Sequence, residues 1–518
     1  MSVSSPPAAA RREVLVVLPG LLLAMMLAML DNVIVGTAMP RIVGELGGLA
    51  HLSWVVTAYV LASTVSTPLY GKLGDLYGRK RLFVTAIVVF LAGSALAGLS
   101  QSMTELITFR AIQGLGAGGL IVSVIAIIGD LVPPRERGRY QGYTAAVMAV
   151  AMLGGPLVGG FLTDQLSWRW AFYVNLPLGG VALALIATTL HLPRHRVSHR
   201  IDYLGASLMA VGTTALVLLA TWGGSRYGWA SAQTLGLAGL GAASIVALIL
   251  TERRASEPLL PLRLFTDRNF SVSASMSFLV GFAMFGAITF LPLFQQTVQG
   301  ASATNSGVLL MPMLLGMLVT SLVAGQLTTR TGRYKVFPIL GGAGMALGMF
   351  LLSMLGVGTS RVTSALFMIV LGIGMGFMMQ IVMLIAQNSV QPRDMGVASS
   401  TNMFFRSVGG SFGVSIFGAI FTSRLRDSLA TGSARASAGA LSGNGGNLDP
   451  ATLHSLPAPV RDGYLHAVAH ATQGVFGWAV LFGLVAFLLA WTIKAVPLRG
   501  RDTQRPAQAQ EPELVSAH

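Results

Sequence analysis

Long apolar runs alternate with short polar connections along almost the whole chain. Runs with the length of a membrane-spanning helix lie near 14–36, 52–70, 82–100, 106–128, 140–162, 169–190, 203–221, 234–251, 270–293, 305–326, 336–356, 363–387, 397–421 and 471–495. A helix of about 20 apolar residues crosses the hydrocarbon core of a bilayer. The pattern therefore predicts an all-α polytopic membrane protein with fourteen transmembrane helices.

Composition and charge support a membrane protein. Charged residues make up only 10% of the 518 residues, whereas a soluble domain carries roughly 25%. The net charge of +15 could favour nucleic acid as a partner. However, most of the 34 Lys and Arg fall in connections on one predicted side of the membrane, which is the positive-inside pattern. We therefore expect the lipid bilayer as the partner, no nucleic acid, and both termini on the cytoplasmic side of the plasma (inner) membrane.

Residues that could support enzyme chemistry are not evident. The chain has no Cys, which excludes disulfides and thiolate metal sites. His466 and His470 are spaced like a metal-binding pair on a helix, but no third ligand is nearby in sequence, so no metal is expected. The stretch 114–119 matches a dinucleotide motif only loosely, and no strand precedes it. We expect no enzyme and no cofactor, with a proton gradient as the energy source.

A repeat divides the chain into two halves. Gly71, Leu73, Gly78 and Arg79 reappear 254 positions later as Gly325, Leu327, Gly332 and Arg333. The stretch 132–138 resembles 390–396 at an offset of 258. The first six helices therefore match the last six, and two helices are left over between them. Many transporters are built from such repeats.

The repeat predicts the domain boundaries. They are a cytoplasmic N-terminus 1–13, a first six-helix bundle 14–195, an inserted helix pair 196–258, a second six-helix bundle 259–495 with an external loop 422–465, and a cytoplasmic tail 496–518. The segment 71–81 is expected to be a cytoplasmic loop with tight turns at Gly74 and Gly78.

Asp31 is the only acid well inside a predicted helix core, where a carboxylate is costly and seldom lacks a purpose. Removal from water favours its protonated form, so we expect Asp31 to bind and release a proton. Arg110 is expected at a similar depth, roughly 7 Å from the outer helix ends at 1.5 Å per residue, so the pair can meet. The alternatives are a fixed salt bridge or helix cap for Asp31, and for Arg110 a role in orienting Gln113.

Two further sets of residues suggest a conformational mechanism. Gly71, Asp75, Gly78, Arg79 and Arg135 are predicted to form a cytoplasmic gate, with Arg139 as an alternative to Arg135; a solvated loop is the simpler interpretation. Gly155, Pro156, Gly159 and Gly160 are predicted to form a hinge or seal at the bundle interface, since proline bends a helix and glycines permit close helix contact. Plain packing is the alternative.

A substrate cavity is predicted from flexible, aromatic and polar side chains within the apolar runs. Its candidate residues are Met29, Trp54, Tyr59, Gln113, Phe285, Gln380, Asn402 and Arg406. Arg406 is a second intramembrane cation without an acid nearby in sequence. It could bind a carbonyl, a lipid phosphate or an anionic substrate, or it could extend its side chain to the membrane surface.

Several stretches resemble signature motifs of the major facilitator superfamily and of its drug:proton antiporters. They are the loop 71–81, the first-helix stretch 30–40, the helix-4 stretch 110–116, the helix-5 stretch 155–160 and the helix-6 entry 168–177. The resemblance covers 14–495 and is to the fourteen-helix drug:proton antiporter family (EmrB/QacA type). It implies a major facilitator fold, two six-helix bundles around a cavity that opens alternately to either side, and a monomer. Thr329 departs from the pattern, which has an Asp there, so the second loop is expected to form a weaker lock.

Together these features predict a proton-coupled antiporter that exports lipophilic, drug-like or antibiotic compounds. An exporter of an endogenous lipid, peptide or metabolite is the alternative, because Arg406 and the extra helix pair leave room for another cargo. A membrane sensor or channel is a third hypothesis, which the two-half repeat disfavours.

Overall fold

A computed structural model describes residues 8–46, 52–132, 134–190, 202–223, 227–255, 261–301, 305, 308–391, 394–431 and 457–498. The helices of the first half are α1 (Ala8–Leu46), α2 (Leu52–Tyr77), α3 (Arg79–Leu99), α4 (Met103–Leu131), α5 (Pro134–Gln165), α6 (Trp170–Tyr173) and α7 (Asn175–Thr189). Two helices follow, α8 (Tyr203–Trp222) and α9 (Ala232–Arg254), with a short 3-10 turn η2 (Leu262–Thr266). The second half has α10 (Arg268–Thr297), α12 (Met311–Thr331), α13 (Val336–Leu352), α14 (Arg361–Asn388), α15 (Met395–Thr431) and α18 (Ala458–Trp491).

Each predicted apolar run coincides with helix in this structure, so the all-helical prediction is confirmed. Among the described residues, ten helices are long and apolar enough to cross a membrane, and two further apolar helices are shorter. The chain is therefore a multi-pass membrane protein. The number of crossings stays a prediction.

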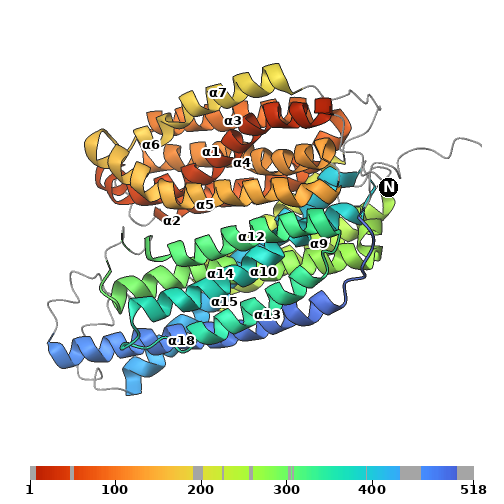
Figure 1. Cartoon of the computed structure of the whole chain (residues 1–518). Helices are drawn as coiled ribbons and strands as arrows, with labels where there is room; N and C mark the ends of the chain where they lie inside the picture. The colour runs from red at the N-terminus through yellow and green to blue at the C-terminus, as the bar shows by residue number, and fades with distance from the viewer. Residues whose placement is uncertain are drawn as a thin grey trace, which may run out of the picture.

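The helices form two groups with the same internal packing (Figure 1). In the first group α4 packs on α2 and α3, and α1 packs on α5 and α7. In the second group α14 packs on α12 and α13, and α10 packs on α15 and α18. The groups meet through two symmetry-related contacts, α5 with α12 and α2 with α15. The arrangement is what a duplicated six-helix unit produces.

The segment 71–81 is not the loop that the sequence predicts. Helix α2 continues through Gly74 to Tyr77, and α3 begins at Arg79, so the chain turns at Gly78 alone. Gly78 has φ of +95°, and its counterpart Gly332, directly after α12, has φ of +70°. This left-handed region favours glycine. The prediction failed because a drop in hydropathy marks where the chain leaves hydrocarbon, not where the helix ends.

The predicted external loop 422–465 is also shorter than expected. Helix α15 continues to Thr431, and α18 already begins at Ala458. The polar residues at these ends are compatible with helix, so loss of hydropathy again did not mark the helix end. Residues 432–456, the linker residues 191–201 and the tail from 499 lie outside the described residues, as do residues 1–7.

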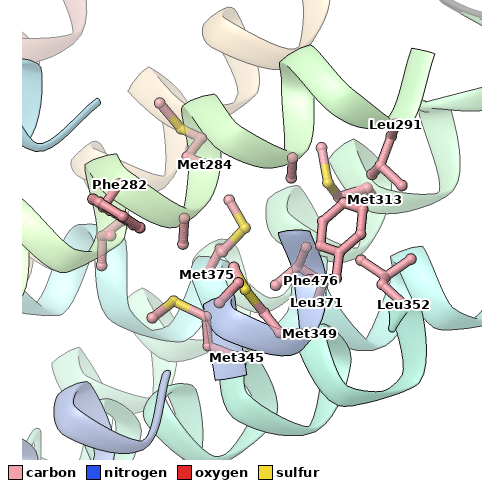
Figure 2. Close-up of a cluster of buried hydrophobic side chains, with 14 of the residues drawn as sticks. Phe282, Met284, Leu291, Met313, Met345, Met349, Leu352, Leu371, Met375 and Phe476 are labelled. Atoms are coloured by element: carbon pink, nitrogen blue, oxygen red, sulfur yellow. The ribbon is translucent and has the colours of Figure 1, made fainter. Parts of the chain in front are cut away.

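The core of the second group is rich in methionine (Figure 2). Met345, Met349 and Met375 gather between its helices, near Phe282 and Met284. Between the two groups lies a smaller buried cluster, which we call the seam cluster; its members are Val122, Ile125, Met383 and Met403. The seam cluster joins α4 to α14 and α15.

The two leftover helices pack against each other, and α8 also contacts both α2 and α15. They therefore cover one place where the two groups meet. Trp222 at the end of α8 packs edge-to-face on Trp54 of α2, with ring centroids 5.4 Å apart.

Candidate functional site

A buried ion pair lies inside the first helix group. Nη1 of Arg110, on α4, donates to Oδ2 of Asp31, on α1, at 2.5 Å. Both side chains have an exposed fraction of 0%. Such a pair is surrounded by a low-dielectric medium, so breaking it by removing one partner is strongly unfavourable.

Neutral polar groups complete the hydrogen bonding of the carboxylate. Its other oxygen, Oδ1, accepts from Nε2 of Gln113 at 2.8 Å and from Nδ2 of Asn175 at 2.7 Å. Ser94 accepts from the same two amides at 3.0 and 2.9 Å, and it donates to the carbonyl of Phe172. We call Asp31, Arg110, Gln113, Asn175 and Ser94 the carboxylate network. It ties α1, α3, α4 and α7 together.

The guanidinium of Arg110 makes additional contacts within the same region. It donates to Oε1 of Gln113 at 2.8 Å and lies over the ring of Tyr59, 4.0 Å from the centroid. The hydroxyl of Tyr59 donates to the carbonyl of Ala28 at 2.8 Å, which fixes the ring. Among the described residues, Nη2 of Arg110 and Oδ1 of Asn175 have no hydrogen-bond partner. A donor nitrogen and an acceptor oxygen of the network are thus unpaired beside an ionisable group.

Close helix contacts hold the network in place. A Cβ on Gly93 of α3 would lie 2.6 Å from the Cα of Gln113 on α4, and a Cβ on Gly114 would overlap the backbone of Tyr59 on α2. Only glycine allows these approaches. They bring α2 close enough to α4 for Tyr59 to reach Arg110, and α3 close enough for Ser94 to reach Gln113.

The residues around Asp31 differ from those that the sequence predicted there. Gln113 and Tyr59 were predicted in the substrate cavity, but Gln113 belongs to the carboxylate network and Tyr59 packs against it, both buried. Asn175 and Ser94 were not predicted. Asn175 stands out only as the polar residue that opens the apolar helix α7, and nothing in the sequence marks Ser94.

The predicted hinge glycines lie on α5, which is helical throughout 134–165. A Cβ on Gly155 would lie 2.7 Å from Cβ of Val33, two residues from Asp31, so this glycine contacts α1 of its own group. It does not lie at the bundle interface as expected. A Cβ on Gly160 would meet nothing within 4 Å, Gly159 is buried, and the side chain of Pro156 lies outside the described ones.

A second charge cluster joins the two helix groups at the end of the molecule that carries Gly78, which we call the basic end. Asp75 pairs with Arg79 at 2.8 Å and accepts from the backbone amide of Val397, in the first turn of α15, at 3.1 Å. Nε of Arg79 also pairs with Asp130 at 2.5 Å. The positive end of the α15 helix dipole thus faces a carboxylate from the other group.

The partners in this cluster differ from those expected. Arg135 or Arg139 was predicted to join Asp75 and Arg79. In the structure their partners are instead Asp130 and the first turn of α15. Arg139 instead donates to the hydroxyl of Tyr143 at 3.2 Å, and the side chain of Arg135 lies outside the described ones. Glycines bring the groups together here, because a Cβ on Gly71 would overlap the side chain of Ser400.

Near the C-terminal end of α1, Glu45 binds two side chains of the turn before α6, and we call this contact the clasp. Glu45 accepts from Nε1 of Trp168 at 2.7 Å and from Arg169 at 3.0 Å. These hydrogen bonds, chiefly that of Trp168, hold the pKa of Glu45 below its ordinary value. Arg169 also donates to the carbonyl of Ser100, so the clasp closes the end of the first group.

The remaining cavity candidates do not all lie together. Trp54 packs on α8, Phe285 is 39% exposed, and Gln380 is buried in α14. Met29 packs against the cores of both groups. A small cavity brings together Asn402 and Arg406; it is lined by Ser277, Val280, Met379, Val382, Met383, Asn402 and Arg406.

Known proteins resemble this chain in sequence and in fold. The family model of the Major Facilitator Superfamily matches residues 21–205 and 204–414. The MFS-type transporter Rv1877 of Mycobacterium tuberculosis is 43% identical over 487 residues, which cover 93% of this chain and 70% of that protein. The multidrug transporter protein MdtP of Bacillus subtilis is 42% identical over 405 residues, covering 78% and 75%.

The human organic anion transporter MFSD10 has a similar structure, with a TM-score of 0.62 at 15% identity, covering 94% of this chain and 100% of that one. At this identity the likeness concerns the fold alone. The family match spans far more than half of the chain, and the close sequence relatives are transporters. The chain therefore belongs to the Major Facilitator Superfamily and is a membrane transporter, not an enzyme.

Proposed function

We propose that this protein is a fourteen-helix, proton-coupled antiporter that exports lipophilic, drug-like compounds across the plasma membrane. The proposal depends above all on one observation: the wholly buried carboxylate of Asp31 accepts hydrogen bonds from three side chains, Arg110 and Gln113 on α4 and Asn175 on α7. A buried ionisable group in a membrane helix is costly unless it has a function. Multidrug transport by the relative MdtP supports a drug-like cargo.

In this proposal Asp31 carries the proton. In the ionised state it is held by Arg110, Gln113 and Asn175. Protonation would remove the charge that attracts Arg110 and free the guanidinium to move. Because the network joins α1, α3, α4 and α7, any change in it acts on the packing of the whole first group.

The basic end is proposed to face the cytoplasm, as the positive-inside rule requires, so both termini are cytoplasmic. The contacts of Asp75, Arg79 and Val397 then close the cytoplasmic side between the two groups. Transport alternates between this closed arrangement and one in which α2 separates from α15. The two groups are the six-helix bundles of the proposal, 14–195 and 259–495, and α8 and α9 form the inserted pair.

Transport in vesicles with an acidic lumen tests the proposal. Purified protein in proteoliposomes should take up ethidium only when the pH gradient is present. The variant Asp31→Asn keeps the shape of the side chain but cannot ionise, so it should lose this uptake while remaining folded. The exposed residue Arg424 provides a control, and Arg424→Gln should transport normally. Gradient-driven uptake by Asp31→Asn would refute the assignment.

A different cargo is the second candidate function. Arg406 is a cation at a cavity in the second group, and a cationic drug would be repelled there. The same vesicles tested with lipids, peptides and metabolites would identify such a cargo if no drug is transported. The protein is proposed to act as a monomer.

A further inference from the structure

Arg406 is a guanidinium deep within the part of the second helix group that the structure describes. It lies in α15, eleven residues after the first residue of that helix, which places it about 16 Å along the axis at 1.5 Å per residue. This depth is close to the middle of a bilayer about 30 Å thick. Substrate sites of secondary transporters lie at this level.

Among the described residues, no acid forms an ion pair with this guanidinium. Between Arg268 and Thr431 the sequence contains only two acids, Asp394 and Asp427. Asp394 is about 18 Å away along the helix and is held by Arg263, with both carboxylate oxygens 2.8 Å from Nη2. Among the residues that the structure describes, Arg406 has no hydrogen bond and no ion pair. Arg406 is partly buried, and the two arginines that are buried among the described residues, Arg79 and Arg110, each pair with an aspartate.

The guanidinium borders a cavity with mixed polar and apolar walls. Asn402, one helical turn before Arg406, accepts from the hydroxyl of Ser277 at 2.7 Å and donates one amide proton to its own helix at 3.2 Å. Its second amide proton remains for a ligand. The apolar wall consists of Val280, Met379, Val382 and Met383. Guanidinium and amide donors beside flexible apolar side chains suit an anionic group attached to an apolar body.

The cavity adjoins the interface between the two groups. Its interior, about 10 Å³, holds roughly one water molecule in this arrangement. However, Met383 belongs to both the cavity wall and the seam cluster. Separation of Val122 and Ile125 from Met383 would therefore open the cavity toward the centre of the molecule.

We propose that Arg406, Asn402 and Ser277 form a subsite for the anionic group of a lipophilic substrate, a carboxylate, sulfonate or phosphate monoester. The subsite rests on the proposed alternating access, because it opens when the groups separate. It specifies lipophilic anions as a cargo class: the apolar body lies against the methionines, and the anionic group neutralises Arg406.

Equilibrium binding tests this subsite without any proton gradient. The full-length protein in phosphatidylcholine nanodiscs would be titrated with dansylaminoundecanoic acid, a fluorescent lipophilic carboxylate, and with its uncharged methyl ester. Arg406→Gln should weaken binding of the acid about tenfold or more, since it removes a charged hydrogen bond, and should leave binding of the ester unchanged. Arg406→Lys should retain most of the affinity. Arg424→Gln, on the exposed end of the same helix, is the matched control and should bind both probes normally.

Asn402→Asp provides a second variant in case Arg406→Gln does not fold. It places a carboxylate one turn from the guanidinium and can still accept from Ser277, so it should abolish binding of the acid. Equal affinity of wild type, Arg406→Gln and Asn402→Asp for the acid would overturn the proposal. Loss of acid and ester together in folded variants would also overturn it, because the site would then be merely apolar.

Nanodiscs containing phosphatidylglycerol distinguish the source of the anion. Displacement of the probe by this lipid would assign the subsite to a lipid headgroup, and no displacement would assign it to a free amphiphile; both results support the shared chemistry. Binding of the acid is measured at equilibrium and proton coupling is measured by transport, so failure of the subsite is separable from failure of the proposed proton coupling.

Discussion

The carboxylate network makes a quantitative prediction for a double-mutant cycle. Arg110→Gln removes the cation from a pair that is wholly buried and leaves the carboxylate of Asp31 without a counter-charge. Breaking a buried pair in this way costs about 3–5 kcal/mol in free energy of unfolding. Two hydrogen bonds to the carboxylate remain, from Gln113 and Asn175, so we expect the lower end, about 3 kcal/mol.

The second single variant and the double variant complete the cycle. The double variant, which combines Asp31→Asn with Arg110→Gln, leaves no buried charge in the network. Only neutral hydrogen bonds are weakened, so its free energy of unfolding should fall by about 1–2 kcal/mol. Asp31→Asn alone leaves Arg110 buried without a counter-charge and should likewise cost about 3 kcal/mol. The double variant should therefore be more stable than either single variant. The losses of the two single variants together should exceed that of the double variant by about 4 kcal/mol, which is the coupling energy. Acid should also reduce the deficit of Arg110→Gln, because the unpaired carboxyl can bind a proton and become neutral.

Equilibrium unfolding by SDS in mixed micelles measures these differences through the fluorescence of the seven tryptophans. Arg424→Gln is the control for removal of an exposed charge. The reasoning is refuted if the losses of the two single variants simply add in the double variant. It is equally refuted if the deficit of Arg110→Gln does not change with pH.

Two further predictions concern the ends of the molecule. Gly71→Val should force α2 away from Ser400 and open the basic end. Because the chain has no Cys, a thiol introduced by Val122→Cys reports the opening, and maleimide should label it faster when Gly71→Val is also present. An unchanged labelling rate would contradict the gate. The lowered pKa of Glu45 means that its clasp stabilises the protein above the ordinary pKa of 4.5 and is lost as pH falls through the lowered value. The difference in thermal stability between wild type and Glu45→Gln should stay constant from neutral pH down to about 4.5 and shrink as the pH falls from there through the lowered pKa. A difference that changes already between neutral pH and 4.5 would count against the clasp.

The sequence predicted the elements whose signals are local. Apolar runs located the helices, and the fixed rise of a helix predicted that Asp31 and Arg110 lie at the same depth. The repeat predicted the equivalence of Gly78 and Gly332, which share a left-handed backbone. These conclusions need only the spacing of residues along one or two helices.

The sequence could not predict contacts that depend on how helices pack. Ser94 is an uncharged residue in an apolar helix, and only the approach of α3 to α4 brings it to Gln113. From the sequence alone, Asp130 is expected at a solvated helix end. The packing of the helices places it beside Arg79. From the sequence, Trp54 could line a cavity, face lipid or contact another helix. In the structure it packs against Trp222 of α8, so it makes a helix contact.

Proton release on substrate binding tests the central claim most directly. Purified protein in weakly buffered detergent solution would be mixed with ethidium, or with dansylaminoundecanoic acid if only that compound is transported, and a pH-sensitive dye would record the protons set free. The account predicts a release of at most about one proton per molecule from wild type that saturates with substrate, and none from Asp31→Asn. The same release from Asp31→Asn would contradict the account, since the exchanged proton would then lie elsewhere.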